Sequence, residues 1–581
     1  MTNSFERLSY SQVTANFSAN KLRTFPGRNK GKARLYPYAK PAITPEAHFN
    51  DNSKFFIAGN CYGRQIERAL KIAGCETTST PDNLSLPGTV LQQYQRYNVY
   101  HQEVATNEIA WAIDPNAQSS DDAFVIVDDE WADMQINFSF AHPKDEAREY
   151  RKTFNAAYKK IKEADVVIVT TGGIELWFDV ETKLYLNTMP NKRIVELYPD
   201  RFELHRFDLE KCEASLQRTV ETILDNTAVS PVVFITASPV FQPTVYTRND
   251  SLIEQSYARA CQRVAAERVC ADYDNVEYLP GLEFTDLSDR KFGFSDFSYN
   301  HTASCMSNRL TAEMLGKYQG PSAGQRTLYA VGHAEALCLA EDYDAAIEVC
   351  KKALDEGINS NVHFDINYLR ALSGAYRGVE ACTWVMNRAP LTPPEDQALF
   401  LIIARVVVQS YASQATLGQF IDIVENWDTD DKAVTAALEN LIAFRETGKA
   451  NTGGADRGYV EEVAGLFAEK EFDKMIERCD ALFIMDCDPK AKSATLRYLD
   501  KTLYLRGGRK MMYYLMIAVG EDSEIEIIWK IKLAQVARGE RNLDPINQVL
   551  KLSDKMNDIP GFKNFLRIME NARAQAIEAA E

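Results

Sequence analysis

Two residues that could do chemistry, Asn60 and Cys61, stand directly after Gly59. They follow a short apolar run, residues 55–58, and precede an amphipathic segment, residues 63–73, so the pattern predicts a strand, a tight turn and a helix. Ligands of open α/β sheets bind at the carboxyl ends of strands, because the next helix points its free N–H groups there. A thiol and an amide at this turn could therefore act as a nucleophile and an oxyanion donor. A Cys61 that is merely packed under the sheet edge is the alternative, since free cysteines are among the most buried residues.

Four further segments carry small or polar residues where a strand is expected to end. Their candidate site residues are Gly88, Thr89, Thr171, Gly172, Ser238, Asp296, Ser298 and His301. Because the carboxyl ends of parallel strands meet at one edge of a sheet, we expect these residues to converge with Cys61. A glycine lets a backbone N–H approach an oxyanion, and histidine is the usual general base. Simpler interpretations stay open: Gly172 as a tight turn, Ser238 as a loop-shaping residue, and His301 as an exposed or helix-capping side chain.

These residues must be positioned by alternating strands and helices. Strands are expected at 55–58, 123–127, 166–170 and 232–236, and helices at 63–73, 144–163, 212–225, 253–273 and 303–315. Continuous apolar strands between helices indicate a mainly parallel sheet that is covered on both faces. The expected fold is a three-layer α/β/α domain.

A chain of 581 residues is too long for one hydrophobic core. Residues 1–50 are polar and contain X-Pro pairs, which predicts an extended arm, and residues 51–318 form the expected α/β domain. Residues 326–581 have helical period almost throughout, which predicts an all-α domain with a division near residue 450. The stretches 343–353 and 472–482 resemble the second helix of a tetratricopeptide repeat, but a one-off helical array stays open. Such an array would dock a protein partner.

Composition excludes several classes of partner. The net charge of −17 argues against nucleic acid or an anionic membrane surface as the main partner. The eleven cysteines form no Cys-x-x-Cys pair and no Cys/His cluster, which predicts a reducing compartment and no structural zinc. No signal peptide and no apolar run of membrane-spanning length is found, so we expect a cytoplasmic protein without membrane insertion. The six other histidines have no partner spacing and are interpreted as structural or surface residues.

The ordered set of motifs resembles a known family. It runs from Gly59-Asn-Cys61 through Gly88-Thr-Val90, Thr170-Thr-Gly172 and Ser238-Pro-Val240 to Tyr278-Leu-Pro280 with Glu283, and ends at His301. This order resembles the GSCFA domain of the SGNH/GDSL hydrolase superfamily. The resemblance implies a flavodoxin-like α/β/α sandwich and ester hydrolysis or acyl transfer, often on glycans.

The departures from the family pattern are as informative as the match. The nucleophilic serine of the family falls on Asn60, and the aspartate that orients the histidine falls on Ser298, with Asp296 as the nearest substitute. The Gly-Asn-Cys motif also resembles the WcbI-type capsular polysaccharide acetyltransferases, a group associated with coenzyme A. That resemblance implies Cys61 as the nucleophile or thiol contact and His301 as its base.

The sequence therefore leads to three hypotheses about function. The first is acyl-ester chemistry, as an O-acetyltransferase or esterase, on a cell-surface or capsular polysaccharide, with acyl-coenzyme A as the donor if the reaction is transfer. The second is a catalytically degenerate domain that binds a sugar or acyl ligand. The third is a scaffold in polysaccharide biosynthesis whose helical domain binds a protein partner.

Overall fold

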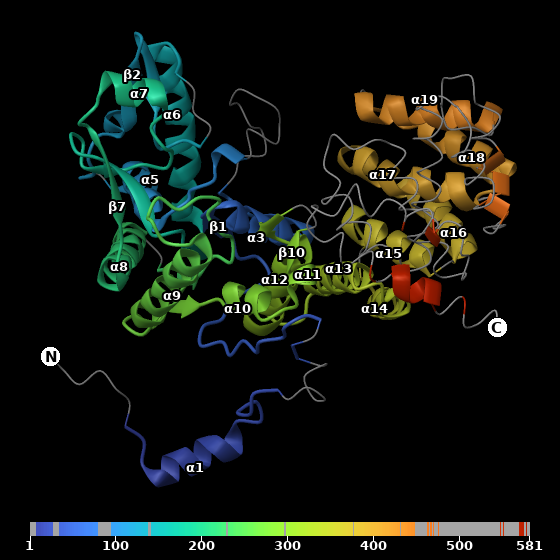
Figure 1. Ribbon diagram of the computed structural model, residues 1–581, viewed down its shortest axis with the longest axis horizontal. Coiled ribbons are helices and arrows are strands. Elements are labelled where there is room, and N and C mark those ends of the chain that lie inside the picture. The colour runs from blue at the N-terminus through green and yellow to red at the C-terminus, as the bar shows by residue number, and fades with distance from the viewer. Residues whose placement is uncertain are drawn as a thin grey trace. The chain divides into compact units, whose positions relative to one another are not determined.

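The computed structural model describes residues 7–447, apart from 27–33, 36, 80–94, 115, 138–140, 228–229, 296–297, 359, 376 and 430, and short stretches beyond residue 447. The chain divides into two compact units (Figure 1). The first consists of Met1–Ala340 and Lys351–Asn359, and the second of Glu341–Cys350 and Ser360–Glu581. Within the described residues, no helix combines the length and the hydropathy needed to cross a bilayer.

A parallel sheet lies at the centre of the first unit. Its order is β1 (Phe55–Ala58), β4 (Val166–Thr170), β8 (Val232–Thr236) and β9 (Val276–Tyr278). At the free edge of β1, Phe55 forms a parallel bridge with Thr77. The four strands of the sheet thus lie side by side in their order along the chain. The prediction of a parallel α/β/α sheet, with residues 55–58, 166–170 and 232–236 as neighbours, is confirmed.

Alternate side chains of this sheet enter two separate hydrophobic cores. Phe56, Val167 and Val233 face one core, whereas Phe55, Val166 and Phe234 face the other. The helices over the first face are α5 (Gln102–Ile113), α6 (Lys144–Lys159), α8 (Leu209–Asn226) and α9 (Ser251–Cys270). Those over the second are α3 (Cys61–Ile72), α10 (Gly281–Asp286), α12 (Ser304–Tyr318) and α13 (Ala323–Leu339). Figure 1 shows these two layers on opposite sides of the strands.

Three antiparallel additions were not predicted. They are the hairpin β2 (Phe124–Val127) with β3 (Glu130–Asp133), the sheet β6 (Leu184–Tyr185), β5 (Glu175–Asp179) and β7 (Phe202–Arg206), and the pair β10 (Phe294–Ser295) with β11 (Ser298–Thr302). Residues 123–127 were expected in the parallel sheet, and that prediction is wrong. Asp128 and Asp129 have φ angles of 50° and 70°, so they form a tight turn that folds β2 back onto β3. Residues 298–301, which we expected in the loop before the helix at 303–315, belong to strand β11.

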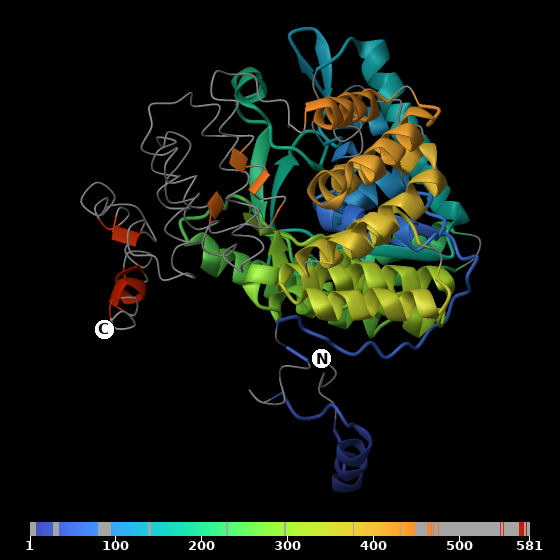
Figure 2. The ribbon, with the colours of Figure 1, turned by 90° about the vertical axis from the view of Figure 1, so that its right-hand side faces the viewer.

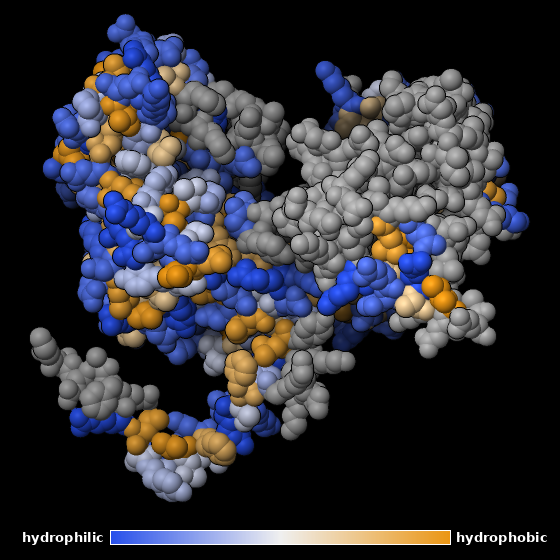
Figure 3. Space-filling view, in the orientation of Figure 1, coloured by the Kyte–Doolittle hydropathy of each residue, from blue (hydrophilic) through white to orange (hydrophobic). Residues whose placement is uncertain are grey.

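The N-terminal arm is also only partly extended. Residues 10–19 form helix α1 (Tyr10–Ala19), because Ser9 and Gln12 make a capping box that satisfies its first N–H groups. No residue of α1 is buried, and Phe17 is exposed. The hydrophobic colour on this helix is visible at the surface in Figure 3.

The second unit is helical throughout its described residues, as expected. Its helices are α15 (Val362–Gly374), α16 (Gly378–Arg388), α17 (Pro394–Tyr411), α18 (Gln414–Glu425) and α19 (Lys432–Thr447). α14 (Tyr343–Asp355) spans the boundary between the units. The remaining short elements are α7 (Lys192–Leu197), α11 (Arg290–Gly293) and the 3-10 turns η1 (Ser120–Ala123), η2 (Lys160–Glu163) and η3 (Ala389–Leu391). In Figure 2, the yellow and orange helices α15 to α19 pack side by side. Residues 472–473 and 476–482 of the second repeat-like stretch lie outside the described residues.

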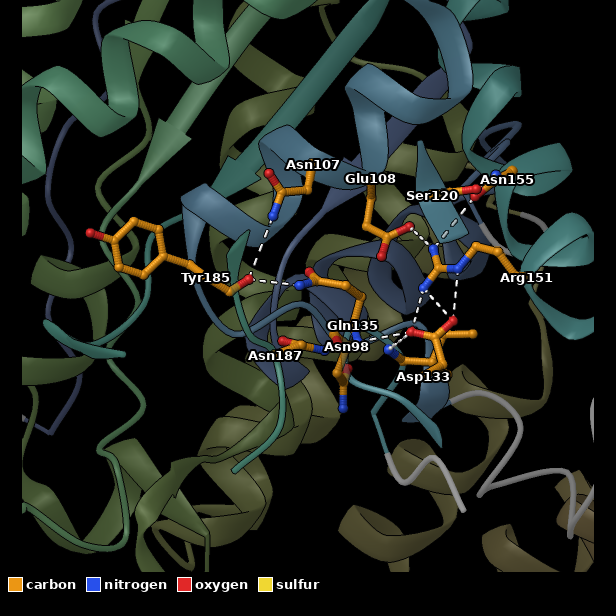
Figure 4. A network of polar contacts seen from close by, with 11 residues as sticks. Asn98, Asn107, Glu108, Ser120, Asp133, Gln135, Arg151, Asn155, Tyr185 and Asn187 are labelled. Atoms are coloured by element: carbon orange, nitrogen blue, oxygen red, sulfur yellow. Dashed lines mark hydrogen bonds and ion pairs between the residues drawn. The ribbon is translucent and has the colours of Figure 1, made fainter. Parts of the chain in front are cut away.

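A buried ion cluster joins the hairpin to the helical layer of the first unit (Figure 4). Arg151 of α6 donates to both carboxylate oxygens of Asp133, at 2.7 Å each, and to Glu108 of α5 at 2.6 Å. All three side chains are nearly inaccessible to solvent. Burial raises the pKa of Glu108 to about 7, and the nearby Arg151 charge opposes that rise. Arg151 is therefore the cation that compensates the charge of the two buried carboxylates.

We predict that Arg151→Met destabilises this part of the first unit by about 3–5 kcal/mol, because it leaves two buried carboxylates without a cation. Arg148→Met is the matched control on the same helix, since Arg148 pairs with Asp121 at the surface and should contribute about 1 kcal/mol or less. Hydrogen exchange of the α5 and α6 amides measures the local change in a two-unit chain. Equal exchange rates in the two variants would contradict the prediction.

Candidate functional site

A cavity of about 510 Å³ lies in the first unit, at the carboxyl ends of β1 and β4. The turn after β1 contributes Asn60 and Cys61 to its lining, and the turn after β4 contributes Gly172 and Gly173. His301 of β11 lines the same cavity together with its neighbour Asn300. Residues distant in sequence thus meet at one sheet edge, where the sequence predicted a site.

Hydrogen bonds to Tyr62, Thr170 and Ser238 hold Asn60 in place. It caps α3 through Oδ1, which accepts the N–H of Tyr62 at 3.0 Å. Its own N–H donates to Thr170 Oγ1, and its Nδ2 donates to Ser238 Oγ, both at 3.0 Å. Asparagine is among the best N-cap residues, so this amide has a structural role wherever the site's chemistry resides.

Gly59 allows this turn to lie against β4. A Cβ at position 59 would stand 2.1 Å from Thr170 Oγ1, which is far inside contact distance. A side chain at position 59 would therefore push the turn away from Thr170 and break the hydrogen bond that holds Asn60.

Cys61 begins α3 and is partly buried. Burial raises the pKa of its thiol to about 11, although the N–H of Tyr62 opposes this shift. The first turn of a helix favours a thiolate, but here the loss of hydration outweighs that effect. With a pKa of about 11, the thiol is protonated at neutral pH. Within the described residues no hydrogen bond joins Cys61 to His301.

His301 has the tautomer that a general base needs. Its Nδ1 lies 2.7 Å from Asn300 Oδ1, and because an amide oxygen only accepts, Nδ1 carries the proton. Nε2 is then the ring nitrogen that can accept a proton. The N–H of Phe241 donates to the Asn300 carbonyl at 3.2 Å, which ties β11 to the segment after β8.

The remaining candidates from the sequence divide into three groups. Gly172 lies in the cavity wall, and its N–H forms no hydrogen bond among the described residues. Thr171 and Ser238 are absent from the lining: the Thr171 N–H donates to the Thr236 carbonyl at 3.0 Å, and Ser238 acts through Asn60. Gly88, Thr89 and Asp296 lie outside the described residues, as does the side chain of Ser298.

Gly172 also fixes a second segment of the wall. A Cβ on Gly172 would stand 1.6 Å from the Tyr100 carbonyl oxygen, so residues 98–101 pass directly over it. Asn187 holds that segment, since it accepts the Tyr100 N–H at 2.9 Å and donates to the Asn98 carbonyl at 2.8 Å. The polar contacts around Asn98 and Asn187 appear beside the buried ion cluster in Figure 4.

Sequence reasoning missed much of the cavity wall. Glu175 and Trp177 of β5, and Gln242 and Tyr246 after β8, all line it. The one available signal was that Glu175 follows the Gly172-Gly173 turn at the start of an alternating segment. His101, interpreted as structural or surface, is the N-cap of α5 and also lines the cavity, and burial lowers its pKa to about 3.

The raised pKa of Cys61 predicts slow alkylation. At pH 8 a thiol of pKa about 11 is about 0.1% thiolate, so iodoacetamide should react roughly a hundredfold more slowly than with free N-acetylcysteine. The rate should rise about tenfold per pH unit up to pH about 11. Mass spectrometry of the Cys61 peptide over a pH series measures this. A rate that levels off below pH 8 would mean an activated thiolate and would contradict the prediction.

Comparison with known proteins supports the resemblance for part of the chain. The model of the GSCFA family matches residues 54–299. Neither the curated proteins nor the solved structures contain a match. Among the described residues no group of three or more His, Cys, Asp or Glu side chains is arranged to hold a metal ion. Residues 54–299 are therefore similar to the GSCFA family, and this range includes every candidate site residue except His301.

Proposed function

We propose that the first unit carries out acyl-ester chemistry, as an O-acetyltransferase or an esterase, on a cell-surface or capsular polysaccharide. The observation that carries this proposal is the convergence of Cys61, Gly172 and His301 on one cavity of about 510 Å³. A thiol, a backbone N–H donor and an imidazole are the groups that acyl transfer requires. The likeness of Gly59-Asn-Cys61 to the WcbI-type acetyltransferases supports Cys61 as the reacting thiol.

In this mechanism Cys61 Sγ attacks the acyl carbon of the bound ester while His301 Nε2 accepts the thiol proton. The Gly172 N–H stabilises the oxyanion, the acyl C–O bond breaks, and His301 returns the proton to the departing alcohol oxygen. Water or a polysaccharide hydroxyl then attacks the thioester carbon while His301 accepts its proton. The C–S bond breaks, and His301 returns the proton to the departing Cys61 sulfur. Catalytic hydrogen bonds often tighten only when substrate binds, which is when His301 would engage the thiol.

Coenzyme A fits this cavity poorly. The described residues of the lining include no Lys or Arg that could pair with its phosphate groups. No step of the mechanism therefore uses it, and the ester donor is left general.

A second candidate function is ligand binding without turnover. It is favoured by the raised pKa of Cys61 and by the amide at position 60, which stands where the family has its nucleophilic serine and which is occupied as a helix cap. In that case the cavity retains a sugar or acyl ligand, and the unit works as a degenerate hydrolase or a scaffold.

For the helical region we propose a tetratricopeptide-like array that binds a protein partner. The support comes from close packing between helices of the second unit. A Cβ on Gly374 would stand 2.4 Å from the Tyr343 ring, and one on Gly378 would stand 2.3 Å from the Tyr411 ring. Aromatic residues packed on glycines in this way bring helices of a hairpin close together.

The test of catalysis is an assay of four proteins on a chromogenic acetyl ester and on acetyl-coenzyme A with glycan acceptors. Cys61→Ala and His301→Ala should each lower turnover by about 10²–10⁴-fold while ligand affinity changes much less. Asn60→Ser keeps an N-cap residue and should slow a working Cys61 enzyme, because it removes the amide donor that binds Ser238 and so loosens the turn that places Cys61. In a degenerate hydrolase the same change would instead create weak esterase activity, because it restores the serine hydroxyl.

Cys75→Ala is the matched control, since Cys75 is also partly buried with a pKa raised to about 11 but does not line the cavity. It should leave turnover unchanged. If wild type and all variants are equally inactive in both assays, binding without turnover replaces the catalytic proposal.

A further inference from the structure

Glu175 is a buried carboxylate that the proposed chemistry does not use. It lines the cavity with 7% of its surface exposed, and its Oε2 accepts the N–H of Tyr246 at 2.9 Å. Its Oε1 has no hydrogen-bond partner, and no cation pairs with it among the described residues. Arg206, which lies opposite it on β7, is instead bound to Glu254. A buried acceptor without a partner is costly, so a donor from outside the chain would satisfy it.

The pleat of β5 places Glu175 beside an aromatic wall. Ile174 and Leu176 point into the core against α8 and α9, so Glu175 and Trp177 lie on the opposite side of the strand. The Trp177 ring meets the Tyr246 ring at a centroid distance of 5.9 Å, and Tyr246 is 48% exposed. Trp177 Nε1 is a buried donor without a partner. Apolar ring faces are thus combined with one free donor and one free acceptor.

Gln242 adds an amide to the same region. A Cβ on Gly173 would stand 2.2 Å from the Gln242 side chain, so this amide lies directly over the glycine turn. The Gln242 N–H donates to Gln255 Oε1 at 3.2 Å, and Gln255 Nε2 donates to the Gln242 carbonyl at 3.1 Å. The side-chain amide itself makes no hydrogen bond within the described residues, which leaves both a donor and an acceptor at the cavity.

We infer that Glu175, Trp177, Gln242 and Tyr246 form a subsite for an uncharged, hydroxyl-bearing ring of the ligand. A hydroxyl group both donates and accepts, which matches the mixture of free donors and acceptors, and a ring with apolar C–H faces can pack on Trp177 and Tyr246. The described lining holds no Lys or Arg to bind an anionic group. An ammonium group would use Glu175 and the rings but would leave the donors of Gln242 and Trp177 without a partner.

This inference rests on the proposed function, because it assigns the sugar of the polysaccharide to one wall of the cavity. Glu175 would accept a hydrogen bond from a ring hydroxyl, and the rings would fix the plane of the sugar. Cys61 and His301 line the same cavity, so the acyl group would lie toward the turns after β1 and β4.

Saturation-transfer difference NMR on the full chain tests the subsite. The probes are methyl glycosides of the common neutral hexoses and N-acetylhexosamines, with choline as a cationic probe and a hexose phosphate as an anionic one. At least one neutral glycoside should bind, with the strongest transfer at its ring C–H protons. Glu175→Ala and Tyr246→Ala should each raise its dissociation constant about tenfold or more, and Glu175→Gln should raise it less. Trp131→Leu, on β3 outside the cavity, should leave it unchanged.

Three outcomes would overturn the inference: transfer from none of the neutral probes, preference for choline or the phosphate, or a dissociation constant that the Glu175 and Tyr246 variants leave unchanged. Because Tyr246 is half exposed, its replacement keeps the test valid even if Glu175→Ala fails to fold. Sugar binding without ester turnover would keep this subsite and remove the proposed catalysis. Turnover of the chromogenic ester without sugar binding would keep the proposed catalysis and remove this subsite.

Discussion

The hydrogen bond from the Asn60 N–H to Thr170 Oγ1 joins the turn after β1 to the last residue of the neighbouring strand β4. It forms only because Gly59 has no side chain, since a Cβ there would overlap Thr170. The same contact sets the start of α3, and with it the position of Cys61. The cavity edge at β1 and β4 therefore depends on one glycine and one threonine packed against each other.

That close packing has a chemical consequence. The contacts that place Cys61 at the cavity also remove water from its thiol, which raises its pKa to about 11. A helix N-terminus is often thought to activate a cysteine, yet its effect on a thiol is smaller than a strong desolvation. Any reaction at Cys61 must therefore begin from the neutral thiol and remove its proton as the ester is attacked. In the proposed mechanism His301, whose Nδ1 faces Asn300 Oδ1, is the group that accepts this proton.

The antiparallel additions supply part of the cavity wall that the parallel sheet does not form. β5 carries Glu175 and Trp177 to the cavity, and Asn187 binds the segment that crosses Gly172. The buried cluster around Arg151 holds the hairpin β2–β3 against α5 and α6. From this hairpin, Gln135 Nε2 donates to the Tyr185 carbonyl of β6 at 2.7 Å. Part of the cavity wall is thus connected to buried polar contacts that lie outside the cavity lining.

The strands β1, β4 and β8, the helices α3, α6, α8, α9 and α12, and the strand-turn-helix at Asn60 and Cys61 could all be predicted from the sequence. These features are local, because a run of β-branched residues or a helical period needs no distant partner to be recognised. The three-dimensional structure was needed to show that residues 124–127 leave the parallel sheet and that Ser238 acts through Asn60. It also showed that Glu175 lines the cavity with no cation beside it among the described residues. It also decided the protonation of Cys61, because a pKa depends on how much water surrounding segments exclude. Burial and long-range hydrogen bonds join residues that lie far apart in the chain, and no local pattern records which of them will meet.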